Sequence, residues 1–135
     1  KKADYCVKVR ADRDQVHNSS GAEETTYHYV IVRRDLPIGF AAGQIVHASG
    51  ETSNGNIDSG THAVVLAADD EHQLTRLASK LGEAFIPYRL IREPDAPYLG
   101  AATAIGLYPT TDRKSVRKVL GSFHFMEVVN DPLTN

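Results

Sequence analysis

The sequence predicts a three-layer α/β domain, with a mixed sheet of roughly four strands and helices on both faces. Short runs rich in β-branched and aromatic residues alternate along the chain with segments of helical periodicity. The last two strand-like runs are joined by a short proline-rich loop without a helix, which predicts a mixed rather than a wholly parallel sheet. The chain has 135 residues, 41% of them hydrophobic, which suits one domain with a single core.

The first strong element is the run YHYVIVRR, residues 27–34, which reads as a central strand that stops at Asp35-Leu36-Pro37. The segment 38–51, IGFAAGQIVHASGE, then predicts a helix with Gln44, His47 and Glu51 on one face. Its many alanines and glycines would let the backbone approach its neighbour closely. Taken alone, this polar face fits a structural role in capping or core hydrogen bonding as well as it fits a site.

The run THAVVLAA, residues 61–68, predicts a second buried strand. Asp69 is expected to cap the helix that follows, and Gly82 is expected to end it. Apolar residues recur at helical spacing between them, at Leu74, Leu77, Ala78 and Leu81.

Two further strands are predicted from IPYRLIRE, residues 86–93, and ATAIGLY, residues 102–108, on either side of the loop EPDAPYLG. The segment 110–123 predicts an amphipathic helix, whose apolar stripe is formed by Val116, Val119, Leu120 and Phe123. The run HFMEVVN that follows fits either a short strand or an irregular tail.

Residues 1–26 are interpreted as an N-terminal extension to a domain of residues 27–135. The run DYCVKVR, residues 4–10, alternates as a half-buried edge strand would, and the polar stretch after it reads as a long loop.

Composition restricts the function. The formal net charge of −2 shows no strongly basic field for nucleic acid, although a local basic patch is compatible with it. A single cysteine, Cys6, allows no intramolecular disulfide and favours a reducing compartment. No apolar run is long enough for a membrane span or a signal peptide, so we expect a cytoplasmic protein with no membrane association.

Motifs for common cofactors are missing from the sequence. There is no GxGxxG, P-loop, GxSxG or HExxH motif, and the six histidines form no ligand-spaced pair on one predicted element. We therefore expect neither a metal site nor an organic cofactor.

Three motifs together resemble the archaeal and eukaryotic type of peptidyl-tRNA hydrolase, the type 2 family. They are IVRRDL at residues 31–36, GFAAGQIVHA at 39–48 and LIREPDAPYLGAAT at 90–103, and the resemblance covers roughly residues 27–123. The family pattern reads V-V-R-x-D-L, G-K-x-A-A-Q-x-x-H-A and L-I-R-D-A-G before G-x-x-T. The resemblance implies a four-stranded mixed sheet between helices and hydrolysis of the ester between a peptide and tRNA, with tRNA as partner, a role in translation and a homodimer.

The resemblance also implies the site residues. Gln44 would donate to the ester carbonyl or to water, Glu93 or Asp95 would activate the water, and His47 is the other candidate base. Thr103 would hold the acidic residue or the water in place. The expected substrate-binding residues are Arg33, Asp35, Arg92, Gly100, Arg113 and Arg117.

The sequence departs from the family pattern at two positions. Phe40 stands where the family has a functional lysine. The aspartate of the family's third motif corresponds to Glu93 or, because the loop is two residues shorter, to Asp95. Arg33, Arg34 or Arg92 could replace the lysine, or could form structural ion pairs. A catalytically silent RNA- or protein-binding module is therefore the alternative to an enzyme, and an esterase or amidase for smaller substrates is a third reading.

The predicted C-terminal helix carries Arg113 and Arg117 one turn apart, with Lys114 and Lys118 beside them. This basic face suits contacts with tRNA phosphates, and it equally suits an ordinary solvated helix surface.

Overall fold

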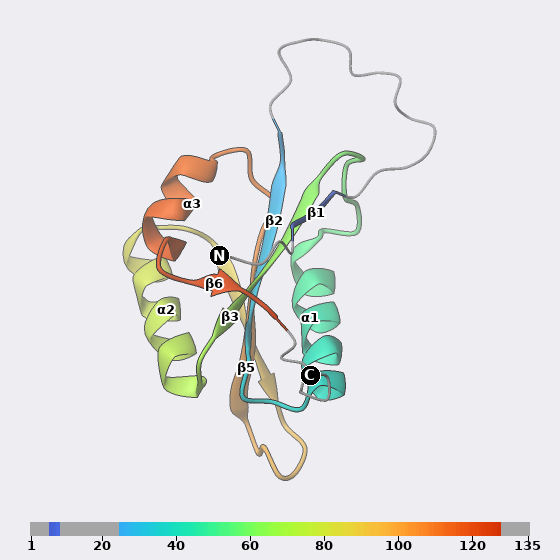
Figure 1. The fold of residues 1–135 in the computed structure, drawn as a ribbon, viewed down its shortest axis with the longest axis vertical. Coiled ribbons are helices and arrows are strands. Elements are labelled where there is room, and N and C mark those ends of the chain that lie inside the picture. The colour runs from blue at the N-terminus through green and yellow to red at the C-terminus, as the bar shows by residue number, and fades with distance from the viewer. Residues whose placement is uncertain (1–5, 9–24, 128–135) are drawn as a thin grey trace, which may run out of the picture.

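The computed structural model describes residues 6–8 and 25–127, which form three helices and six strands (Figure 1). In chain order the elements are β1 (Cys6–Lys8), β2 (Tyr27–Arg33), α1 (Ile38–Thr52), β3 (His62–Ala68), α2 (Glu71–Glu83), β4 (Tyr88–Glu93), β5 (Ala101–Leu107), α3 (Arg113–Leu120) and β6 (His124–Phe125). None of these three helices is long and apolar enough to cross a membrane.

The strands form one mixed sheet in the order β1-β3-β2-β5-β4, and β6 pairs with β3. The central pair β2 and β3 is parallel, because α1 connects them, whereas β5 is antiparallel to both β2 and β4. Helix α1 covers one face of the sheet, and α2 and α3 cover the other (Figure 1). The predicted α/β class with a mixed sheet is confirmed.

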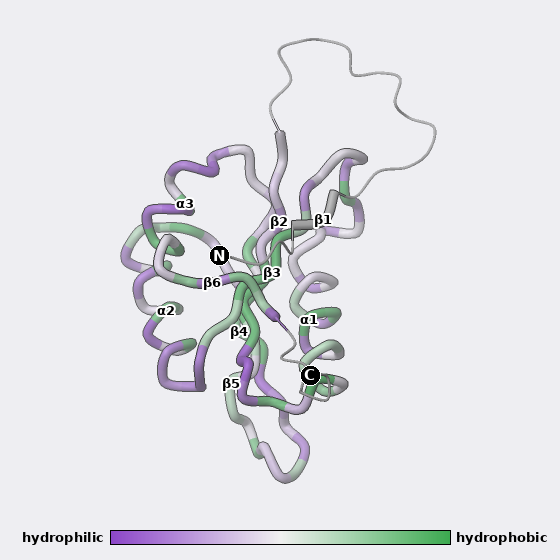
Figure 2. The backbone as a smooth tube through the Cα atoms, viewed as in Figure 1, coloured by the Kyte–Doolittle hydropathy of each residue, from purple (hydrophilic) through white to green (hydrophobic). Residues whose placement is uncertain are grey.

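Hydrophobic residues fill both spaces between sheet and helices. Ile31, Leu74 and Leu107 belong to the core beneath α2 and α3, whereas Val30, Val32 and Ala104 belong to the core beneath α1. Figure 2 shows the consequence along the backbone: the middle of the sheet is hydrophobic, and α2 and α3 alternate between hydrophilic and hydrophobic residues. Alternation along β2 thus supplies side chains to both cores.

The sheet is wider than the four strands expected. The N-terminal edge strand exists as β1, whose three residues pair antiparallel with β3. In the run HFMEVVN, the first two residues form β6, which also pairs with β3. The other residues of the N-terminal extension before 25, and those after 127, lie outside the described residues.

The caps of α2 differ from the prediction. Its N-cap is Asp70 rather than Asp69, because the Asp70 carboxylate accepts the Gln73 backbone N–H at 2.9 Å. Asp69 instead forms an ion pair with Arg34. Gly82 does not end α2 but lies in its last turn, and the helix continues to Glu83. The four apolar residues predicted to face the core are buried.

Helix α1 lies unusually close to β5. A methyl group built on Gly106 would be 2.6 Å from the Ala48 carbonyl oxygen and 3.0 Å from the Thr52 hydroxyl oxygen. Ala41 and Ala48 are fully buried on the same face of the helix. Small residues on both elements therefore set the distance between helix and sheet.

A buried histidine joins β2 to the C-terminal turn of α1. The His28 ring nitrogen Nε2 lies 2.8 Å from the Thr52 hydroxyl, which donates to the Ala48 carbonyl at 2.8 Å. Burial lowers the pKa of His28 below its usual value of 6.5, although a hydrogen bond with the Leu107 backbone opposes this shift. The neutral ring is consequently the form that the folded protein favours.

We expect Gly106→Ala to lower the free energy of unfolding by about 1–3 kcal/mol, because the helix backbone must move to admit the methyl group. Urea unfolding measures this. Gly43→Ala is the matched control, since Gly43 is exposed within α1 and its added methyl group meets nothing within 4 Å. That change should raise stability by about 0.5–1 kcal/mol. Equal effects of the two changes would contradict the close packing.

Stability should fall below about pH 6.5, because unfolded His28 binds a proton at its ordinary pKa whereas the folded protein resists it. The contribution is fully present above pH 6.5 and is lost as the pH falls towards the folded pKa, with a slope approaching about 1.4 kcal/mol per pH unit. Urea unfolding between pH 8 and pH 5 measures it. His28→Gln should flatten the slope and the exposed control His72→Gln should not; a wild-type slope in His28→Gln would exclude this cause.

Candidate functional site

The candidate site lies where the ends of several elements meet, at the lower end of the molecule in Figure 1. Strands β2 and β4 end there, α1 and β5 begin there, and the loop of residues 94–100 joins β4 to β5. The mixed sheet topology thus brings all three sequence motifs to one end of the sheet.

The centre of the site is the buried amide of Gln44. Its Oε1 accepts the Thr103 hydroxyl at 2.6 Å, and its Nε2 donates to Glu93 Oε1 at 3.4 Å. Thr103 is fully buried and Gln44 is 4% exposed, whereas Glu93 is half-buried. Because the ionised Glu93 carboxylate only accepts hydrogen bonds, the NH2 end of the amide faces Glu93 and its oxygen faces the Thr103 hydroxyl.

A β-bulge aims Thr103 at Gln44. Ile91 pairs with Ala104 and Arg92 pairs with Ala102, which leaves Thr103 without an opposing residue on β4. An extra residue in one strand redirects its side chain. The Thr103 hydroxyl also lies 3.3 Å from the Ile91 carbonyl oxygen across the same irregularity. The bulge therefore places a hydroxyl under α1.

The two acidic candidates occupy different positions. Glu93 contacts Gln44 through Oε1 and accepts the Asp95 backbone N–H at Oε2, at 3.1 Å. Asp95 is exposed, and its carbonyl oxygen accepts the backbone N–H groups of Tyr98 and Leu99. The carboxylate of Glu93 is thus held from both sides, while Asp95 shapes the loop through its backbone.

The polar face expected on α1 is divided in the structure. Gln44 is buried against the sheet, whereas His47 and Glu51 are exposed. Glu51 pairs with Arg89 of β4 at 3.0 Å. Among the hydrogen bonds of the described residues, none connects His47 with Gln44, Glu93 or Thr103.

Arg33 and Asp35 form a bidentate ion pair, with both N···O distances near 3 Å (Nε–Oδ1 2.9 Å, Nη2–Oδ2 3.0 Å). This contact raises the pKa of Arg33 further above its usual value. The remaining Nη1 donates to the Ala102 carbonyl at 2.9 Å, while Glu71 Oε2 accepts the Ala102 N–H at 2.9 Å. The pairs between β2 and β5 reach only Val32 and Ala104. The side chains of Arg33 and Glu71 therefore make the hydrogen bonds to the Ala102 backbone that a neighbouring strand would otherwise make.

The other two arginines near the site also have partners. Arg34 pairs with Asp69 at 3.0 Å, and both side chains are exposed. Arg92 donates to the carbonyl of Gly100 at 2.9 Å and is exposed. Gly100 has a φ of +95°, which closes the loop, and its N–H donates to the Glu93 carbonyl at 2.7 Å.

An aromatic pair lies beside the polar centre. The Phe40 ring stacks on Tyr98 with 4.5 Å between ring centroids and 12° between planes. Phe40 lies one helical turn before Gln44, and Tyr98 belongs to the loop that follows Glu93. The stack therefore joins the same two segments as the Gln44–Glu93 hydrogen bond.

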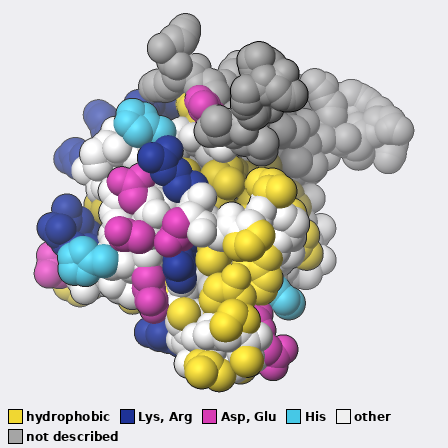
Figure 3. All heavy atoms as spheres, turned by 60° about the horizontal axis from the view of Figure 1, so that its bottom comes forward, with side chains coloured by type: hydrophobic (Ala, Val, Ile, Leu, Met, Phe, Trp, Pro, Cys, Tyr) yellow, Lys and Arg dark blue, Asp and Glu magenta, His cyan; other side chains and the backbone are white. Residues whose placement is uncertain are grey.

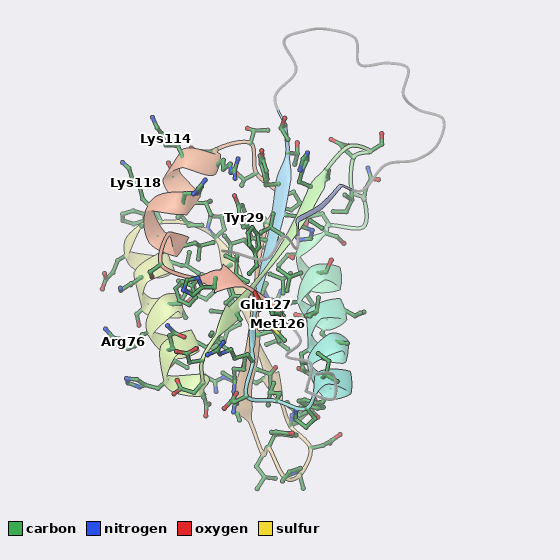
Figure 4. All side chains as sticks on the ribbon, viewed as in Figure 1. Tyr29, Arg76, Lys114, Lys118, Met126 and Glu127 are labelled. Carbon is green, nitrogen blue, oxygen red and sulfur yellow. The ribbon has the colours of Figure 1, made fainter. Side chains whose placement is uncertain are left out.

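The basic face of α3 lies away from this centre. The Arg113 guanidinium is 4.6 Å from the Tyr27 ring centroid, and its Nη1 donates to the Tyr27 hydroxyl at 3.2 Å. Tyr27 begins β2 and Arg33 ends it, so the two ends are about 20 Å apart. Figure 4 shows Lys114 and Lys118 projecting outward from α3. Arg113 and Arg117 are thus on the opposite face of the sheet from α1 and near its other end.

Within residues 6–8 and 25–127, no group of three histidine, cysteine, aspartate or glutamate side chains is arranged to hold a metal ion.

Fold and site together define a three-layer α/β domain with a glutamine, a threonine and a glutamate in one hydrogen-bonded chain at the end of a mixed sheet. Residues 26–126 match the family described as peptidyl-tRNA hydrolase PTH2. Since the match covers most of the chain, the protein belongs to this family, which confirms the resemblance found in the sequence.

Two further comparisons were made. No curated protein matches the chain. A solved structure of a protein of unknown function from Agrobacterium tumefaciens strain C58 is 21% identical and covers 78% of this chain and 100% of its own, with a TM-score of 0.51. At this identity the likeness shows the fold alone.

Sequence reasoning did not find two contributors to this region, Glu71 and Tyr98. Glu71 reads as an ordinary first-turn residue of α2, and its bond to Ala102 depends on where the β2–β5 pairing stops. Tyr98 lies in an irregular loop, where no periodicity indicates which way a side chain points. Neither had a local signal.

Thr103→Val should lower the free energy of unfolding by about 1–3 kcal/mol, because it leaves Gln44 Oε1 buried without its donor while nearly preserving shape. The measurement is urea unfolding. Thr75→Val is the matched control: the Thr75 hydroxyl donates to the His72 carbonyl on the surface of α2, and its loss should cost less than about 0.5 kcal/mol. Similar losses in both variants would show that the Thr103–Gln44 bond contributes nothing specific.

Proposed function

We propose that this protein hydrolyses the ester that joins a peptide or an N-blocked aminoacyl group to tRNA. The observation that carries the proposal is the Gln44 amide held between the Thr103 hydroxyl and the Glu93 carboxylate. Membership of the peptidyl-tRNA hydrolase PTH2 family supplies the substrate class. A role in translation, a cytoplasmic location and a homodimer belong to the same proposal, and light scattering tests the last.

Glu93 acts as the general base in this proposal. Its carboxylate takes a proton from a water molecule, and the water oxygen forms a bond to the ester carbonyl carbon. When the tetrahedral intermediate collapses, the bond between that carbon and the ribose oxygen breaks, and the ribose oxygen receives the proton from Glu93. No covalent nucleophile is required. Glu93 is favoured over Asp95 because only Glu93 contacts Gln44.

Gln44 acts as the hydrogen-bond donor. The Thr103 hydroxyl occupies Oε1, so both Nε2 hydrogens face the Glu93 side. One of them bonds to Glu93, and the other is available to the carbonyl oxygen as it becomes negative. A donor fixed before the reaction stabilises this charge without reorganising.

Loss of the family lysine weakens this stabilisation. The absence of one such donor typically costs about 3–4 kcal/mol, or a factor of hundreds to a thousand in rate. Arg33 is a poor replacement, because Asp35 and the Ala102 carbonyl already occupy its guanidinium. Arg92 is no better placed, because it bonds to the Gly100 carbonyl and lies between Ile91 and Glu93 on β4, where strand alternation directs its side chain to the opposite face of the sheet from Gln44. We therefore propose a slow hydrolase.

A second candidate function is a binding module for RNA or a protein that has lost catalysis. The observation that favours it is the Phe40–Tyr98 stack at the position where the resemblance places a cation. An aromatic ring cannot stabilise an oxyanion as a lysine does. Binding without turnover is the property that would distinguish this candidate.

Glu93→Gln should lower the rate of deacylation of N-acetyl-aminoacyl-tRNA by about 100-fold or more, because the general base is lost. Asp95→Asn is the matched control: it makes the same carboxylate-to-amide change two residues away and should stay within a few-fold of wild type. The measurement is release of free tRNA over time, with unfolding curves for each variant. A large loss only in Asp95→Asn, or only in His47→Ala, would move the base to that residue.

Gln44→Met completes this series, since methionine keeps the volume and removes both hydrogen bonds. It should abolish turnover under conditions in which its unfolding curve shows that the variant is folded. If wild type itself releases no tRNA but binds it, the second candidate replaces the first.

A further inference from the structure

The lower end of the molecule separates apolar from charged side chains. Figure 3 looks towards this end and shows hydrophobic side chains gathered in one band and acidic and basic side chains on the other side. Two exposed apolar residues belong to segments at this end, Leu99 in the loop after β4, 74% exposed, and Ile38 at the start of α1, 53% exposed. Both border the segments that hold the Gln44–Glu93 pair.

The exposed apolar surface continues into the Phe40–Tyr98 stack. Both rings are only partly buried, and they pack against the core that contains Ala41 and Ile91. Leu99 directly follows Tyr98, and its φ of +45° is a conformation that bulky residues rarely adopt. The loop thus keeps a leucine in a strained conformation with its side chain in solvent, where folding gains little from it.

Charge decides which part of an ester would occupy this surface. Asp95 and Glu93 lie on the segment that carries Tyr98, and α1 offers no cation there because residue 40 is phenylalanine. Arg92 lies between Ile91 and Glu93 on β4, so the alternation of the strand directs it to the opposite face of the sheet. A nucleotide stacked on these rings would bring its phosphate towards two carboxylates, whereas an uncharged acyl side chain would meet no repulsion.

We propose that Phe40, Tyr98 and Leu99 form the subsite for the side chain of the acyl group, and that the protein selects esters of bulky apolar amino acids. This inference rests on the proposed function. Phe40 and Tyr98 act as specificity-determining residues. The side chain of the substrate packs on the exposed parts of their rings, and the ester carbonyl of the substrate extends along α1 towards Gln44, four residues or about 6 Å further along the helix. Burial of apolar area supplies the preference.

The test uses one tRNA charged with either N-acetyl-phenylalanine or N-acetyl-alanine. Wild type should favour the phenylalanyl ester by about tenfold or more in kcat/KM. Phe40→Ala and Tyr98→Ala should each lower kcat/KM for the phenylalanyl ester far more than for the alanyl ester, and so remove most of this preference. Phe85→Ala is the matched control, because Phe85 is 91% exposed in the α2–β4 connection and should leave the preference unchanged.

A binding measurement separates this inference from the proposed function. The probes are 3′-amide-linked N-acetyl-phenylalanyl- and N-acetyl-alanyl-adenosine, which the protein cannot hydrolyse as esters. Turnover of both tRNAs without a preference, or a preference that survives both alanine variants, would overturn the inference and leave the hydrolase intact.

Absence of turnover would reject the hydrolase, and binding of the probes would then decide. Tighter binding of the phenylalanyl probe than of the alanyl probe, with the difference abolished in Phe40→Ala, supports the subsite. Equal binding of the two probes overturns it. If replacing the adenine of the probe abolished binding while exchanging its acyl group did not, the rings would bind the base instead, and the inference would be overturned as well.

Discussion

The close approach of α1 to β5 is the constraint on which the rest of the structure depends. Gly106 leaves room for the Ala48 carbonyl, which would lie 2.6 Å from any β-carbon at that position. At this separation the amide of Gln44, one turn before Ala48, reaches the hydroxyl of Thr103 three residues before Gly106. A larger residue at either position would push the helix away and lengthen a 2.6 Å hydrogen bond beyond its useful range. Packing of small residues thus determines the geometry of the polar centre.

The same end of the sheet shows how strand endings are stabilised. Pairing between β2 and β5 stops at Val32 and Ala104, and the bulge at Thr103 would leave the backbone of Ala102 without partners. Arg33 and Glu71, from different elements, bond to its carbonyl and N–H. Arg33 is consequently committed to structure, since Asp35 takes the rest of its guanidinium. A motif that resembles part of the site in the sequence contributes mainly to support of the sheet.

The sequence predicted the elements well because their signals are local. Helical and strand periodicity identified α1, α2, α3 and the four long strands, and in the structure Gln44, Glu93 and Thr103 of the family resemblance lie together. Local signals failed where the outcome depends on partners distant in sequence. Asp69 and Asp70 are equally good caps by residue type, and only the ion pair with Arg34 assigns Asp69 elsewhere. Helical spacing put His47 near Gln44, yet rotation about the helix axis leaves His47 in solvent.

The distribution of positive charge bears on the proposed recognition of tRNA. Near the polar centre, Arg33 and Arg34 are paired with carboxylates, and Phe40 replaces the cation expected on α1. The basic side chains Lys114 and Lys118 extend from α3, on the other face of the sheet and towards its other end (Figure 4). Phosphate contacts are electrostatic and act without sequence or acyl specificity, so they suit a surface remote from the chemistry. On the proposed function, the polar centre would then select its ester through contacts with uncharged groups, which an amide donor beside an aromatic surface provides.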